Sequence, residues 1–187
     1  MSTQIDSYNF FLYIFSTIPD KAFVEKILSQ EFASEAPGVD LIKNYIKSVK
    51  DKSIDDIFNE ISVDRTYLLY GLRTEGPRPP HASLYVKADI LEASRFLNRT
   101  YRKYGFKILE GNYPPDHITV QMAFMKKLYE QGDASYDARK DFFTNNLGKW
   151  GKDFAQEMIK FAKTDFFRGI GHLFESFLEE EMAFYSN

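Results

Sequence analysis

Apolar side chains recur at intervals of three and four residues along most of this chain, the spacing that places them on one face of an α-helix. The first such stretch, Tyr8 to Phe15, ends before Pro19. In the stretch at residues 90–104, Ile90 and Phe96 are expected to share the buried face. A break is expected near Ser62. The pattern predicts helices at residues 8–15, 21–28, 39–49, 54–72, 90–104, 115–131, 142–147, 150–161 and 166–178.

Several of these helices begin or end at residues suited to capping. Asp20, Ser53 and Asp89 each precede an apolar stretch, and their side-chain oxygens can accept hydrogen bonds from the first N–H groups of a helix. Pro115 suits the first position of the helix that follows it. Gly105 can take the left-handed conformation that often ends a helix.

No segment alternates between apolar and polar residues for long enough to predict a strand. The stretches at residues 84–86 and 108–109 are apolar but short. We therefore expect an all-α fold, formed by a single compact multi-helix domain over residues 1–187 without a substantial sheet.

The composition favours a folded chain with a large core. Its 187 residues include 18 Phe, 12 Tyr and one Trp, and each buried ring removes about 150–250 Å² from water. The net charge of −3 provides no general attraction to phosphate backbones, so nucleic acid is not an expected partner. The absence of cysteine excludes disulfides, thiolate nucleophiles and cysteine-based metal sites.

No membrane span is expected from the sequence. The longest apolar run, Tyr8 to Phe15, is much shorter than the roughly 20 residues that cross a bilayer. Residues 1–6 lack the basic region of a secretory signal. We expect a cytoplasmic protein.

Two proline-anchored segments carry the residues with the most interesting chemistry. The first runs from Pro77 to Tyr85 and includes His81 and Ser83; the second is Pro114-Pro115-Asp116-His117. Such segments can be plain connections, in which the aspartate favours the positive end of a helix dipole and the histidine packs as an ordinary ring. Alternatively, the extended backbone and polar side chains can form an edge that receives a peptide. The sequence leaves both interpretations open.

Motifs for catalysis are weak. No nucleophile elbow surrounds any serine, and no glycine-rich phosphate loop occurs. We therefore expect no catalytic residues, no cofactor and no metal site. The alternative is a small metal-dependent hydrolase that uses Asp116, His117 and His81.

Together these segments resemble the TorD/DmsD/NarJ family of chaperones for molybdopterin oxidoreductases. The resemblance covers about residues 60–178 and rests on the two proline-anchored segments, on the stretch Phe143–Leu147 and on Trp150. It implies an all-helical fold in which the two segments form one side of a peptide groove. The peptide-binding residues implied are His81, Ser83, Tyr85, Glu110, Pro114, Asp116 and His117.

Glu110 has a particular place in that expectation. In the family a glutamate commonly precedes the Pro-x-Asp-His signature, but Tyr113 stands at this position here. Glu110, three residues earlier, is the carboxylate that could replace it.

The resemblance implies a chaperone and not an enzyme. Its partner would be the catalytic subunit of a molybdopterin oxidoreductase, or the leader peptide of that subunit, which can carry twin arginines. Binding would assist cofactor insertion and assembly, or proofread export, by a monomer or a homodimer. An Asp116→Ala change would weaken peptide binding with little effect on the fold, if the carboxylate accepts a charged hydrogen bond from the partner.

Overall fold

The computed structural model describes residues 2–16, 19–30, 35–71, 75–86, 89–108 and 113–186. These residues are helical for most of their length and contain no strand, so the prediction of an all-α fold is confirmed. The only pairing of extended backbone that they show is one isolated bridge between His81 and His117. None of the described helices is both long and apolar enough to cross a membrane.

The chain divides into two compact units. Unit 1 comprises residues 1–17, 80–152 and 178–187, and unit 2 comprises residues 18–79 and 153–177. The prediction of one domain over residues 1–187 stays a prediction, and each unit is described by itself.

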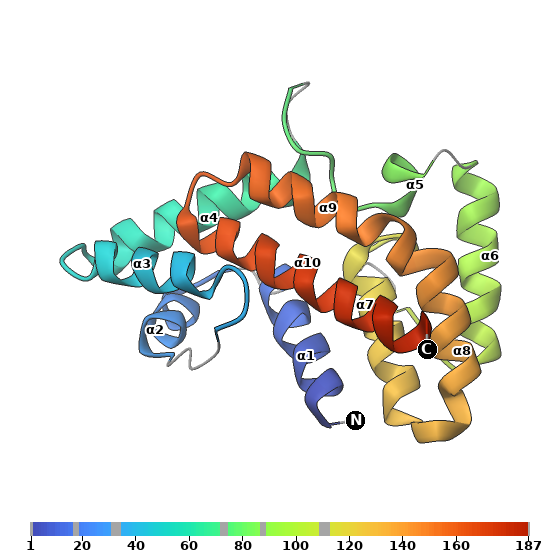
Figure 1. The fold of residues 1–187 in the computed structure, drawn as a ribbon. Coiled ribbons are helices and arrows are strands. Elements are labelled where there is room, and N and C mark those ends of the chain that lie inside the picture. The colour runs from blue at the N-terminus through green and yellow to red at the C-terminus, as the bar shows by residue number, and fades with distance from the viewer. Residues whose placement is uncertain are drawn as a thin grey trace. The chain divides into compact units, whose positions relative to one another are not determined.

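Unit 1 is built around a central helix, α7 (Ile118–Glu130), which packs against α1 (Ser2–Ser16) and α8 (Tyr136–Phe142), as Figure 1 shows. Nine of the 13 residues of α7 are buried, including Phe124. The rings of Tyr101, Phe124 and Phe142 lie with their centroids 4.7–5.9 Å apart. This packing of large rings removes much apolar surface from water and fixes the helices that carry the candidate site.

The remaining helices of unit 1 surround this core. They are α5 (Ala82–Tyr85), α6 (Ile90–Lys103), the π-helical turn η2 (Phe143–Leu147), the 3₁₀ turn η1 (Gly132–Ser135), the first residues of α9 (Gly148–Phe161) and the last of α10 (Asp165–Ser186). Asp89 caps α6 by accepting hydrogen bonds from the N–H groups of Leu91 and Glu92, each at 2.9 Å. Gly105 follows α6 with a φ of 67°, so both caps predicted for this helix are confirmed.

Unit 2 contains α2 (Lys21–Ser29), α3 (Val39–Val49), α4 (Ile54–Tyr70), most of α9 and the first half of α10. The predicted caps Asp20 and Ser53 accept hydrogen bonds from the N–H groups of Phe23 and Asp56. The buried carboxylate of Asp64 accepts from the N–H of Thr164, at 2.8 Å, and thereby fixes the start of α10.

Three sequence predictions about the elements were wrong. The break near Ser62 does not occur, because α4 runs without interruption from Ile54 to Tyr70. Pro115 is not the first helical residue, since α7 begins at Ile118 with His117 as its N-cap. Ile90 and Phe96 are exposed rather than buried.

Candidate functional site

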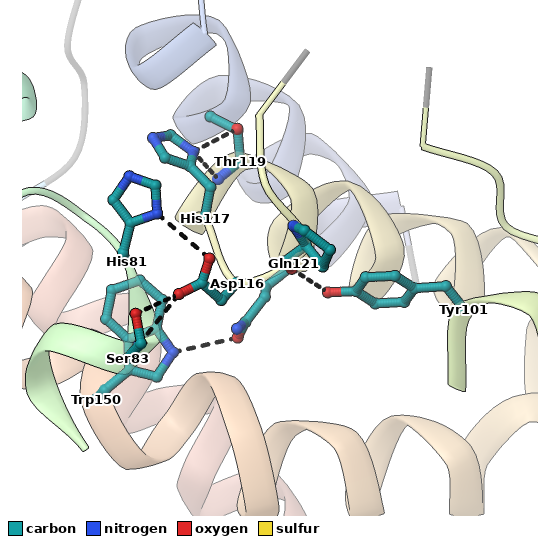
Figure 2. Close-up of polar contacts among 9 residues, drawn as sticks. His81, Ser83, Tyr101, Asp116, His117, Thr119, Gln121 and Trp150 are labelled. Atoms are coloured by element: carbon teal, nitrogen blue, oxygen red, sulfur yellow. Dashed lines mark hydrogen bonds and ion pairs between the residues drawn. The ribbon is translucent and has the colours of Figure 1, made fainter. Parts of the chain in front are cut away.

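The two proline-anchored segments meet side by side in unit 1. The N–H of Ala82 donates to the carbonyl oxygen of Asp116 at 3.0 Å, and the N–H of Ile118 donates to the carbonyl oxygen of Pro80 at 2.9 Å. These two hydrogen bonds form the antiparallel bridge between His81 and His117. Figure 2 shows the side chains of both segments converging around it. The pairing brings residues 35 positions apart in the sequence into direct contact.

The Asp116 carboxylate joins the two segments. One oxygen, Oδ2, accepts hydrogen bonds from the hydroxyl of Ser83 at 2.7 Å and from the N–H of Ser83 at 3.3 Å. The other, Oδ1, lies 3.3 Å from Nδ1 of His81. Only 4% of Asp116 is exposed. The carboxylate therefore accepts hydrogen bonds from its own chain and does not present a free acceptor to solvent.

The pKa of Asp116 reflects this environment. Burial alone would raise the pKa, because it disfavours the charged carboxylate. The hydrogen bonds from His81 and Ser83, together with the attraction of the His81 ring, outweigh burial and lower the pKa from 3.8 to about 2. Asp116 is consequently ionised at neutral pH.

His117 caps α7 and packs between two rings. Its Nδ1 accepts a hydrogen bond from the N–H of Thr119 at 3.2 Å and lies 2.8 Å from the Thr119 hydroxyl. Because Nδ1 is an acceptor, the neutral ring carries its proton on Nε2. The ring stacks on Tyr113, with centroids 4.0 Å apart, and meets His81 edge-on at 4.9 Å. Because His117 is only 4% exposed, it stabilises the site from within and is not part of its exposed surface.

Other contacts hold the second segment and the neighbouring rings. The Tyr101 hydroxyl donates to the Pro115 carbonyl at 2.7 Å, and the Trp150 indole N–H donates to the Gln121 side chain at 3.2 Å (Figure 2). The half-buried ring of Tyr85 lies 5.3 Å from the Trp150 ring. Helix α5 and helix α9 are joined by this ring contact.

The structure accounts for the predicted site residues in different ways. It brings His81, Ser83, Asp116 and His117 together, and it places Tyr85 against Trp150. Pro114 is exposed at the start of the second segment. Glu110 lies outside the described residues. The role of all these residues in peptide binding stays a prediction.

Beside the paired segments, unit 1 contains an open cleft of about 350 Å³, within the size range typical of ligand pockets. Ala82, Ser83 and Val86 form one side of it. Phe96 of α6 and Trp150 of α9 contribute rings, and Lys149 is the one charged side chain among the described residues that line it. Ser83 thus connects the two features, because it lines the cleft and holds Asp116.

Sequence reasoning missed most of this cleft. Phe96 was expected in the core, yet 47% of it is exposed. The available signal was that residues 90–104 carry more apolar side chains than one buried stripe requires. Leu97 and Tyr101 form the buried face of α6, which leaves Ile90, Leu91 and Phe96 outside it.

The metal-dependent hydrolase has no support in the part of the chain that the structure describes. Those residues contain no group of three or more His, Cys, Asp or Glu side chains placed to hold a metal ion. His81, Asp116 and His117 are adjacent, but Nδ1 of His117 and the Asp116 carboxylate are engaged with their own chain.

Comparison with known proteins identifies the family. The family model of the nitrate reductase delta subunit matches residues 33–156, which is more than half of the chain. A search of curated proteins found no match. The chain belongs to the nitrate reductase delta subunit family, a family of chaperones for the maturation of molybdoenzymes. The resemblance proposed from the sequence is thereby confirmed.

Proposed function

We propose that this protein is a cytoplasmic chaperone that binds the catalytic subunit of a nitrate-reductase-type molybdoenzyme before its cofactor is inserted. Membership of the family supports a role in molybdoenzyme maturation. The cleft of unit 1 supports capture of a client segment, because the exposed Phe96 lines it together with other apolar side chains. This cleft is the single observation that carries the proposal. The segment held there is either a terminal leader or another part of the unassembled subunit.

In this proposal the two proline-anchored segments position the site and do not grip the client through Asp116. The carboxylate and the His117 ring are both 4% exposed, and each bonds to its own chain. A rigid receiving surface loses little entropy of its own when a flexible segment binds. Exposed side chains at the cleft, above all Phe96, then contact the client.

A pull-down from native lysate, read by quantitative mass spectrometry, tests the partner. We expect the catalytic subunit of a molybdopterin oxidoreductase to be enriched over a control bait. Enrichment of other proteins alone, or of none, would contradict the proposal.

A matched pair of variants tests the surface. Phe96 and Phe184 are both 47% exposed in unit 1, but only Phe96 lines the cleft. Phe96→Ser should reduce capture of the subunit about tenfold or more, as expected for loss of an aromatic anchor worth about 2 kcal/mol. Phe184→Ser should leave capture within about twofold. Equal losses in the two variants would show that the cleft is not the client site.

A further inference from the structure

Helix α6 from Ala93 onward, together with the residues that follow it, carries only positive charge. Residues 93–108 include five Lys or Arg and no Asp or Glu, although the chain as a whole carries −3. None of these five cations makes an ion pair with another described residue. All five are exposed: Arg95, Arg99, Arg102, Lys103 and Lys107.

The four cations that belong to α6 share one face of that helix. Successive residues of a helix turn by about 100°, and the four cations consequently fall within an arc of about 100°. Leu97 and Tyr101 are buried on the opposite side of α6. The helix lies at the right-hand edge of unit 1 in Figure 1. The arc of cations, called the basic face below, therefore points away from the core of unit 1.

The stability of the helix does not explain the basic face. Arg102 and Lys103 lie in the last turn, where cations interact favourably with the helix dipole. Arg95 and Arg99 come before that turn, and they are four residues apart, a spacing at which like charges repel. Glu92, the one acid of α6, forms no ion pair with another described residue. An anionic partner outside the chain would stabilise this arrangement.

Exposed apolar side chains at the start of α6 indicate which anionic partner fits. Ile90 is 58% exposed and Leu91 is 68% exposed, and Leu91 lies beside the arc of cations. A lipid surface interacts with both kinds of side chain, because its phosphates attract cations and its headgroup boundary takes up apolar groups. The phosphates of a nucleic acid would leave these two side chains in water. A folded protein would need a complementary concave surface to cover the convex face of a helix.

We propose that the basic face docks this protein on an anionic lipid surface. The cations of α6 contact the headgroup phosphates, and Leu91 enters the interfacial layer. Helix α6 then lies along the membrane. The residues that α6 contributes to the cleft, Ala93, Phe96 and Leu97, centre on a different side of the helix. The inference therefore goes beyond the proposed function and does not depend on it.

Cosedimentation of the full chain with lipid vesicles tests the docking. One set of vesicles is phosphatidylcholine alone, and the other also contains about one-third phosphatidylglycerol, which is anionic. We expect the anionic vesicles to bind the chain at least about tenfold more tightly at low salt, because each cation near such a surface strengthens binding roughly fivefold. Added salt should weaken this preference, since it screens exposed charges.

Paired variants test the basic face itself. Arg95→Gln combined with Arg99→Gln should weaken binding to anionic vesicles about tenfold or more, as expected for the loss of two cations at the surface. The same two positions changed to Lys keep their charge and should retain binding. The control is Lys47→Gln combined with Lys50→Gln, which removes two exposed cations of unit 2 and should change binding by less than about twofold.

A second pair of variants tests the apolar contact. Leu91→Ser should weaken binding to anionic vesicles about threefold or more, because Leu91 no longer removes apolar surface from water. Val63→Ser is the control, since Val63 is 61% exposed but belongs to α4 in unit 2. Circular dichroism of each variant confirms that it is folded.

Four results would overturn the proposal. They are equal binding to the two kinds of vesicle, binding to neither kind, equal losses in the Arg and Lys double variants, and tighter binding of a DNA duplex that Arg95→Gln with Arg99→Gln abolishes. The last result would assign the basic face to nucleic acid. Capture of a molybdoenzyme subunit without vesicle binding would overturn this inference alone, and vesicle binding without such capture would leave it standing while the proposed function fails.

Discussion

Asp116 joins the two proline-anchored segments, and its carboxylate accepts hydrogen bonds from Ser83 of its own chain. The sequence singled it out correctly as part of a special local arrangement, because a carboxylate beside a histidine follows two prolines. It could not show that the carboxylate turns toward Ser83, 33 residues earlier. The expectation that removing this side chain leaves the fold intact is revised, since a buried ionised group holds two segments together.

Asp116→Asn should lower the free energy of unfolding at pH 7 by about 2 kcal/mol, because the depressed pKa of Asp116 reports a carboxylate that the folded state stabilises. The folded-state pKa lies below the unfolded one. The wild type is therefore more stable than Asp116→Asn above about pH 3.8, and this difference in the free energy of unfolding disappears as the pH falls toward 2. Urea unfolding at several pH values measures it. Asp133→Asn is an exposed control, and an equal effect of the two changes would contradict this role.

Glu181 should show the opposite pH dependence. Burial raises its pKa above 4.5, although hydrogen bonds from Tyr129 and Tyr8 and the charge of Arg139 act against this. The folded state therefore favours the protonated form. The wild type should gain stability relative to Glu181→Gln as the pH falls from 7 toward 4.5, and lose it as the pH rises again. Urea unfolding at pH 7 and pH 5 measures the difference, with exposed Asp133→Asn as control. A stability difference between the wild type and Glu181→Gln that is the same at both pH values would contradict this prediction.

At the scale of elements, local signals predicted helix starts well and interruptions poorly. Asp20, Ser53 and Asp89 cap helices as expected, because capping depends on residues within one turn. The continuation of α4 through Ser62 depends on burial of Ile61 and Leu68 within the folded chain. Likewise, the start of α7 at Ile118 depends on the hydrogen bond from Ile118 to Pro80. Such non-local contacts are not visible in the local pattern.

The close approach of α3 and α10 in unit 2 gives a prediction at this scale. Gly38 has a φ of 88°, and a Cβ there would overlap the carbonyl oxygen of Gly169. Gly105 has a similar φ, but a Cβ there would meet nothing within 4 Å. Gly105→Ala should cost about 1 kcal/mol for the left-handed backbone. Gly38→Ala should cost about 1–3 kcal/mol more for the overlap. Thermal or urea unfolding measures the loss of stability in each variant. Equal losses in Gly38→Ala and Gly105→Ala would show that α3 and α10 can move apart without cost.

At the scale of the whole chain, sequence reasoning reached the fold class and the family and only part of the site. The two proline-anchored segments carry recognisable motifs, so the sequence singled out His81, Ser83, Asp116 and His117, which the structure brings together. Their role in peptide binding stays a prediction. The cleft beside them draws its lining from α5, α6, α7, η2 and α9. Phe96 has no motif, and its place in the cleft depends on how these elements pack in unit 1. The residue proposed above all to meet the client was therefore one that the sequence could not identify.

The most direct test of the chaperone role is the molybdenum content of the client. The catalytic subunit captured by this chain would be purified from cells that contain the chain and from cells that lack it, and molybdenum per subunit would be measured by elemental analysis. The account predicts that subunit made without the chain contains much less molybdenum, and that the wild-type chain restores it while Phe96→Ser does not. Equal molybdenum content in the presence and absence of the chain would contradict the account.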